Sequence, residues 1–180
     1  MNLKFILLFC YVTIGYFVSL ACQAKTPGEV MVGSFLRDVK MNGLNVNDKS
    51  LKSYQGKPLI INVWASWCGP CKAEMSSLEI LAKKQNHSFN LIGISTDDYP
   101  ERALKLIKQT SITFDNYIDK KLVLENMLGA NRIPLTILID KDGKVLKKFR
   151  GAMKWDHPLM IKMIDSIFSE EKNKTTHKLN

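Results

Sequence analysis

The chain has 180 residues, which suits one domain with short appendages because domains cluster around about 100–150 residues. Hydrophobic residues make up 46% and charged residues 24%, a globular composition that excludes a fibrous repeat or a wholly disordered chain. The net charge is +9, and four Cys, at positions 10, 22, 68 and 71, are too few for a scaffold built from disulfides.

Residues 1–22 are predicted to be a targeting segment. An uncharged apolar run follows Lys4, and a positive start before such a run is typical of an export signal. Ser19 and Ala21 are small residues at the positions that suit cleavage before Cys22. Three outcomes stay open: a lipid attached to Cys22, cleavage that leaves a soluble protein, or retention as a membrane anchor. Each of them places the rest of the chain on the outer, periplasmic side of the cell membrane.

The remaining chain divides into three parts. Residues 23–34 contain Pro and Gly and show no hydrophobic period, so we expect a linker. Residues 35–169 carry the strand and helix patterns of a single domain. Residues 170–180 are polar and are predicted to be a frayed tail.

Strand and helix patterns alternate along the domain. Asn42-Gly43 favours a tight turn, so residues 35–40 and 44–46 are predicted to pair as a hairpin. Residues 59–65 form a nearly all-apolar run, typical of a strand covered on both faces. Further strands are expected over 91–95, near 117–118, over 135–139 and over 145–149, and helices over 51–54, 70–85, 101–109, 122–128 and 158–168.

This alternation predicts an α/β fold in which helices cover both faces of one central sheet. The segment 140–143, Asp-Lys-Asp-Gly, favours a turn between the last two strands. That turn adds antiparallel pairing, so the sheet is expected to be mixed, with the amino-terminal hairpin as an extension.

The chemistry is predicted at one strand-to-helix junction, Trp67-Cys68-Gly69-Pro70-Cys71. Two Cys at this spacing in the first turn of a helix can form a small disulfide ring. The free N–H groups and the positive dipole end of the helix favour a thiolate at the more exposed Cys68, which is then the nucleophile. Cys71 would resolve the mixed disulfide, and Pro70 suits the first turn because its missing N–H costs nothing there.

An inert disulfide or half of a zinc site would use the same spacing. Zinc needs further Cys or His ligands, but the predicted domain has no other Cys. The only His residues in the chain are scattered at positions 87, 157 and 177. We therefore predict no metal and no cofactor beyond a redox-active Cys68–Cys71 disulfide.

The motif at residues 67–71 and the segment Arg132–Thr136 (RIPLT) together resemble the active site of the thioredoxin superfamily. The export signal and the amino-terminal hairpin resemble the TlpA/ResA-like branch, and the resemblance covers about residues 33–168. It implies a thioredoxin-like fold in which the bond before Pro134 is cis and Pro134 faces the cysteines. The Ile133 backbone would then be open to pair with a substrate strand.

The resemblance also assigns supporting roles beside the cysteines. Gly69 and Pro70 match thioredoxin. Trp67 is expected to shield the disulfide and to form a flat apolar surface for docking, with simple packing as the alternative.

Two polar residues bear on proton transfer. Asn62 stands where thioredoxin has a buried Asp that is thought to deprotonate the resolving cysteine, and an amide cannot do so. Glu74, three residues after Cys71, matches an acid of the ResA-like branch. The hypothesis is that Glu74 is partly buried, has a raised pKa and accepts the proton of Cys71. The alternative is a solvated acid that only stabilises the helix dipole.

These features predict an exported thiol–disulfide oxidoreductase that reduces disulfides of periplasmic proteins. The resemblance suggests apocytochrome c as a partner and a membrane thiol–disulfide protein as electron donor, with a monomeric domain. Dispersed basic pairs are compatible with an anionic membrane surface, and nucleic acid is not expected as a partner. A peroxiredoxin-like peroxidase would need a Thr where Ala65 stands. A metal chaperone or binding module on the same fold is a further alternative.

Overall fold

The computed structural model describes residues 28–84 and 88–177. The predicted targeting segment, including Cys22, and the first part of the predicted linker lie outside the described residues. Within the described ranges, no helix combines the length and the apolar character that a membrane crossing requires.

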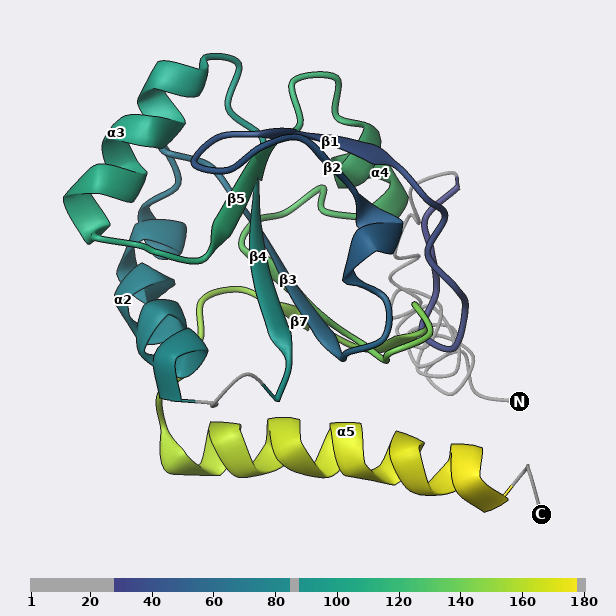
Figure 1. Cartoon of the computed structure of the whole chain (residues 1–180). Helices are drawn as coiled ribbons and strands as arrows, with labels where there is room; N and C mark the ends of the chain where they lie inside the picture. Colours follow the sequence, from purple (N-terminus) through teal and green to yellow (C-terminus); the bar gives the residue numbers. More distant parts are fainter. Residues whose placement is uncertain (1–27, 85–87, 178–180) are drawn as a thin grey trace, which may run out of the picture.

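Seven strands form one mixed sheet, in the order β2-β1-β5-β4-β3-β6-β7 (Figure 1). All six residues of β3 are buried, because it lies inside the sheet, parallel to β4 and antiparallel to β6. Its apolar, β-branched sequence suits a strand that is covered on both faces. The strands are β1 (Lys40–Gly43), β2 (Lys49–Ser50), β3 (Leu59–Trp64), β4 (Asn90–Ser95), β5 (Asp115–Ile118), β6 (Leu135–Ile139) and β7 (Val145–Arg150).

Helices cover both faces of the sheet, as predicted. Side chains of β3 alternate between the two layers: Ile60 and Trp64 join one core cluster, and Ile61 and Val63 join the other. The first cluster packs against α2 (Gly69–Lys84), α3 (Pro100–Thr110) and α5 (Pro158–His177). The second packs against the 3-10 helix η1 (Leu51–Tyr54) and α4 (Val123–Leu128), so the predicted α/β fold is confirmed.

An amino-terminal hairpin forms, but its strands and turn are not the predicted ones: β1 pairs with β2, and of the predicted strand residues 35–40 and 44–46 only Lys40 lies in either. Asn42 and Gly43 lie in β1, where they pair with Ile118 and Tyr117 of β5, and the turn follows at 44–48. A Cβ atom on Gly43 would lie 1.8 Å from the Val46 carbonyl oxygen. Glycine is therefore needed for a close backbone approach and not for a turn conformation.

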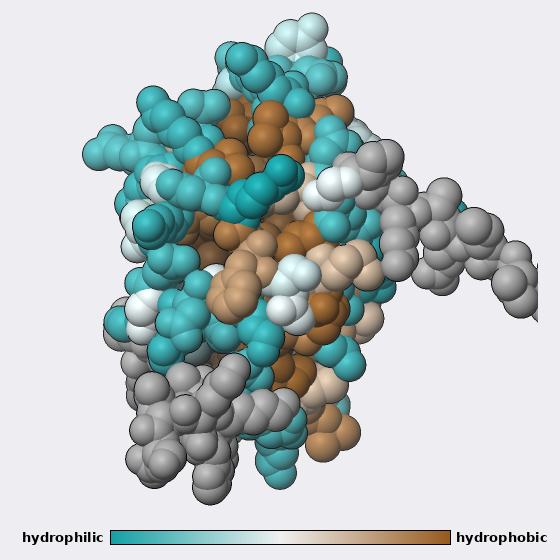
Figure 2. All heavy atoms as spheres, turned by 90° about the vertical axis from the view of Figure 1, so that its right-hand side faces the viewer, coloured by the Kyte–Doolittle hydropathy of each residue, from teal (hydrophilic) through white to brown (hydrophobic). Residues whose placement is uncertain are grey.

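The described part of the predicted linker is attached to the domain, so that prediction is wrong for residues 28–34. Val30 N–H donates to Met127 O at 2.8 Å, and Gly33 N–H donates to Val145 O at 2.8 Å. Glu29 accepts a hydrogen bond from Lys148 Nζ at 2.7 Å. Figure 2 shows the face that carries this segment and α4, where apolar side chains come to the surface between polar ones.

The last helix is longer than predicted. Its apolar pattern ends at Phe168, which packs on Phe89 with ring centres 5.9 Å apart. The helix nevertheless continues to His177, and Lys144 Nζ lies 2.6 Å from Glu171 Oε1 beyond the apolar part. Most of the segment 170–180, predicted to be a frayed tail, is therefore helical. This segment carries no apolar stripe, so hydrophobic periodicity could not reveal its helix.

Candidate active site

The turn from β3 into α2 occupies only residues 65–68 and is fixed by a buried carboxylate. Ser66 N–H donates to Asp97 Oδ2 at 2.8 Å, and Ser66 Oγ donates to Asp97 Oδ1 at 2.6 Å. Ser95 Oγ also donates to Asp97, at 2.8 Å. Cys68 N–H donates to Ala65 O at 3.1 Å. Asp97, which follows β4, therefore holds the chain in place two residues before Cys68.

Cys68 and Cys71 form a disulfide across the first turn of α2, with their Cα atoms 5.3 Å apart. Cys68 retains 5% exposure, whereas Cys71 is fully buried, so a partner protein can reach only the Cys68 sulfur. The Cys71 N–H points at Cys68 Sγ from 3.1 Å. When the pair is reduced, this N–H and the helix dipole stabilise negative charge on Cys68.

The second motif comes from the loop before β6 and lies against the disulfide. The Ile133–Pro134 peptide bond is cis, and Ile133 O lies 3.8 Å from Cys68 Sγ. The contact is van der Waals in kind because a disulfide sulfur carries no proton. Pro134 is buried and Ile133 is partly exposed beside Cys68. Pairing of the Ile133 backbone with a substrate strand stays a prediction.

Trp67 is 67% exposed, whereas Trp64 and Trp155 are fully buried. Of the two interpretations of Trp67, packing in the core is therefore wrong. Gly69 and Pro70 are exposed beside it. An exposed indole next to a reactive sulfur gives a protein partner an apolar surface to contact.

Glu74 is 2% exposed, and its carboxylate accepts three hydrogen bonds, from β3 and from the segment before α5. Asn62 Nδ2 donates to Oε1 at 2.8 Å, and Trp155 Nε1 and Met153 N–H donate to Oε2 at 2.9 and 3.0 Å. Burial raises the pKa of Glu74, while the three hydrogen bonds favour the charged form and oppose that rise. The solvated-acid alternative is wrong, and the proton role of Glu74 stays a prediction.

The sequence did not reveal three residues that hold this site. Asp97 lies near a strand end with no motif around it, and Trp155 stands alone before the last helix. The sequence indicates only that the Asn62 amide cannot accept a proton, not that it donates a hydrogen bond to Glu74. Asn62 also donates to Thr136 Oγ1 at 2.9 Å, and its own Oδ1 has no hydrogen-bond partner among the described residues.

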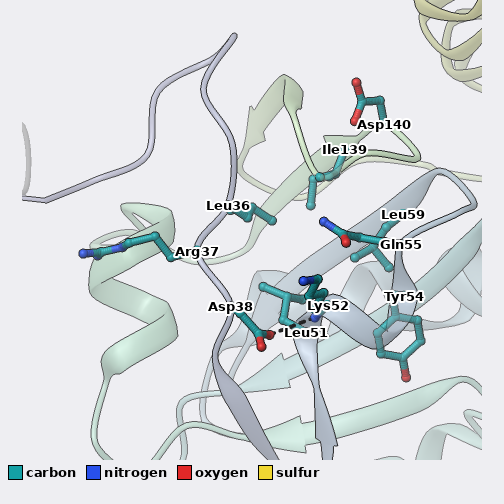
Figure 3. A pocket seen from close by; sticks show the side chains of 11 residues that line it. Leu36, Arg37, Asp38, Leu51, Lys52, Tyr54, Gln55, Leu59, Ile139 and Asp140 are labelled. Carbon is teal, nitrogen blue, oxygen red and sulfur yellow. Dashed lines mark hydrogen bonds between the residues drawn. The ribbon is translucent and has the colours of Figure 1, made fainter.

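A separate hollow lies at the other end of the sheet (Figure 3). It has a volume of about 240 Å³ and is lined by residues such as Leu36, Asp38 and Gln55. Leu59, which opens β3, also lines it, so a strand of roughly 20 Å separates the hollow from Cys68. No Cys or His lines it. In the described part of the chain, no three His, Cys, Asp or Glu side chains group as a metal site.

The raised pKa of Glu74 predicts how stability depends on pH. The folded state holds the Glu74 proton to a higher pH than the unfolded chain, so stability falls as pH rises above about 4.5, the ordinary glutamate value. In urea unfolding of the oxidised protein from about pH 4 to about pH 8, the free energy of unfolding should therefore fall more, or rise less, in wild type than in Glu74→Gln. The exposed Glu101→Gln variant should follow wild type. Parallel curves for wild type and Glu74→Gln would contradict the raised pKa.

Comparison with known proteins agrees with this geometry. Residues 31–164 match the Redoxin family. The thiol-disulfide oxidoreductase ResA of Geobacillus thermodenitrificans is 31% identical over 125 residues, which cover 69% of this chain and 72% of that protein.

Solved structures give the same result. A Chlorobium tepidum protein assigned as the thiol:disulfide interchange protein DsbE has a TM-score of 0.69 at 25% identity, over 77% of this chain and 99% of its own. A DsbF homologue from Corynebacterium diphtheriae has a TM-score of 0.64 at 27% identity, over 74% and 86%. With its cysteines joined at the start of α2, this chain belongs to the Redoxin family and is a thiol–disulfide oxidoreductase of the ResA and DsbE type.

Proposed function

We propose that this oxidoreductase reduces disulfides of proteins outside the cytoplasm, including the haem-attachment cysteines of apocytochrome c. The observation that carries the proposal is a disulfide with one reachable sulfur, Cys68, between the exposed Trp67 and the Ile133 backbone. A small oxidant would need neither flanking surface, whereas an extended protein segment can use both. Export rests on the sequence of residues 1–22.

The reaction consists of two exchanges and moves two electrons. The Cys68 thiolate attacks one sulfur of the substrate disulfide, and the other substrate sulfur leaves as a thiolate that takes up a proton. Cys71 then loses its proton and attacks Cys68, which releases the second substrate thiolate and closes the Cys68–Cys71 disulfide. A thiol–disulfide protein of the membrane restores the dithiol.

A lipid on Cys22 or a retained anchor would keep the domain close to that donor, and a cleaved soluble form is the alternative.

Glu74 is proposed as the group that accepts the Cys71 proton. It lies one helical turn after Cys71, and burial raises its pKa above the ordinary glutamate value, which makes the carboxylate a stronger base. Asn62 orients the carboxylate through its 2.8 Å hydrogen bond. Asn62 stands where thioredoxin has an Asp, and in this chain it positions Glu74, which is proposed to accept the proton.

Cysteine variants test the proposed reaction. With a dithiol donor and an oxidised Cys-x-x-Cys-His peptide, Cys68→Ser should abolish turnover because the nucleophile is gone. Reduced Cys71→Ser, mixed with the oxidised peptide without the donor, should accumulate a mixed disulfide between Cys68 and the peptide, visible as a mass increase that added dithiol removes. Turnover that survives in Cys68→Ser would refute the proposal, and turnover of hydrogen peroxide alone would favour the peroxidase alternative.

Release of the mixed disulfide tests the proton role of Glu74. Glu74→Gln should slow this step near neutral pH and change its pH profile, because Cys71 must then lose its proton to solvent and no longer to a buried carboxylate. Glu79→Gln is the matched control, since Glu79 is also buried on α2 but is bound to Thr113 and Lys83. An unchanged pH profile in Glu74→Gln would remove the proton role.

A further inference from the structure

A groove lies between the first turn of α2 and one side of α3, beside the redox pair. It has a volume of about 250 Å³ and is lined by Ser66, Lys72, Arg102, Lys105, Leu106 and Gln109. Ser66 precedes Cys68 by two residues, and Lys72 follows Cys71 directly. The Lys72 N–H also donates to Cys68 O at 3.1 Å. The groove is therefore lined at one end by chain neighbours of the two reacting cysteines.

The lining carries three cations and no anion. Lys72, Arg102 and Lys105 are exposed, and they take part in none of the ion pairs found within residues 28–84 and 88–177. Those ion pairs engage other cations: Lys40, Lys49, Lys83, Lys141, Lys144, Lys148 and Arg150. The positive charge of the groove is therefore available to a partner.

The carboxylates near the groove form no ion pair with its three cations among the described residues. Asp97 is buried, and its oxygens accept hydrogen bonds from Ser66 and Ser95. Asp98 and Glu101 are exposed near the start of α3 but do not line the groove. The Arg102 guanidinium lies over the ring of Tyr99, 5.0 Å from its centre, and Tyr99 itself is 56% exposed. Stacking on an aromatic ring orients a guanidinium and leaves its N–H groups free to bind carboxylates.

We propose that this groove binds an acidic segment of the protein substrate, next to the cysteine that Cys68 attacks. The inference rests on the proposed function, in which the substrates are proteins. Arg and Lys side chains form charge-assisted hydrogen bonds with Asp and Glu, and a cleft lined by one sign of charge raises the local concentration of an oppositely charged partner. Lys72, Arg102 and Lys105 thus determine which disulfide proteins are reduced fastest.

Anionic lipid headgroups would satisfy the same charges, but the position of the groove favours a protein. Because Ser66 and Lys72 flank the redox pair, a membrane surface lying on the groove would cover Cys68. Cys68 is only 5% exposed and needs its open side for the substrate. An acidic segment of the substrate would instead occupy the groove during the reaction itself.

The test uses two disulfide peptides that differ only in flanking residues, Asp and Glu in one and Asn and Gln in the other. In the full chain, kcat/KM should be about tenfold higher for the acidic peptide, through KM, and high salt should reduce this ratio. The Arg102→Gln/Lys105→Gln double variant should bring the ratio to about one while kcat for the neutral peptide stays unchanged. Lys84→Gln/Lys108→Gln removes the same two charges outside the groove and should keep the preference.

A binding measurement separates this inference from the proposed function. Peptides with Ser in place of Cys cannot react, so their affinity, followed by tryptophan fluorescence, reports on binding without the reaction. The inference is supported if wild type binds the acidic peptide more tightly than the neutral one and the groove variant does not. This holds even if no peptide is reduced, because a lack of reduction would refute only the proposed function. Equal binding of both peptides overturns the inference. The inference is also overturned if the groove variant loses salt-sensitive binding to phosphatidylserine vesicles but still prefers the acidic peptide, because the groove would then bind lipid headgroups.

Discussion

The buried carboxylate of Glu74 is the interaction on which the active site depends. It joins β3 through Asn62, α2 through its own backbone, and the segment before α5 through Met153 and Trp155. A buried carboxylate left without such donors would cost far more than a neutral group, so the three segments are held together around it. Glu74 also lies one turn from Cys71, which is the position from which we propose that it accepts the Cys71 proton.

Two buried carboxylates thus hold the segments on either side of the redox pair. Asp97 holds the turn that leads into Cys68, and Glu74 holds the helix that follows it. Between them Cys68 keeps its one open side, and the helix start supplies N–H groups to its sulfur. The groove of Lys72, Arg102 and Lys105 extends this rigid centre towards the substrate, so reaction and selection of the partner would share one short stretch of chain.

Local patterns predicted most of the fold, and contacts between distant segments account for what they missed. The apolar run at 59–65 and the motif at 67–71 gave the central strand, the helix start and the redox pair because their signals are contained in a few neighbouring residues. The Asn42-Gly43 turn was misplaced because pairing with β5, more than seventy residues later, decides where β1 ends. Trp155 and Asp97 escaped notice since a hydrogen bond to a residue far along the chain leaves no periodicity in the sequence.

The reduction potential of the Cys68–Cys71 pair tests the account most directly. A buried acid beside Cys71 disfavours the dithiolate and so favours the disulfide form, and the Gly-Pro pair between the cysteines matches thioredoxin. Equilibration of the full chain with dithiol and disulfide buffers should give a potential near the thioredoxin value of about −270 mV. A potential towards about −120 mV, typical of a strong oxidant, would contradict a reductase.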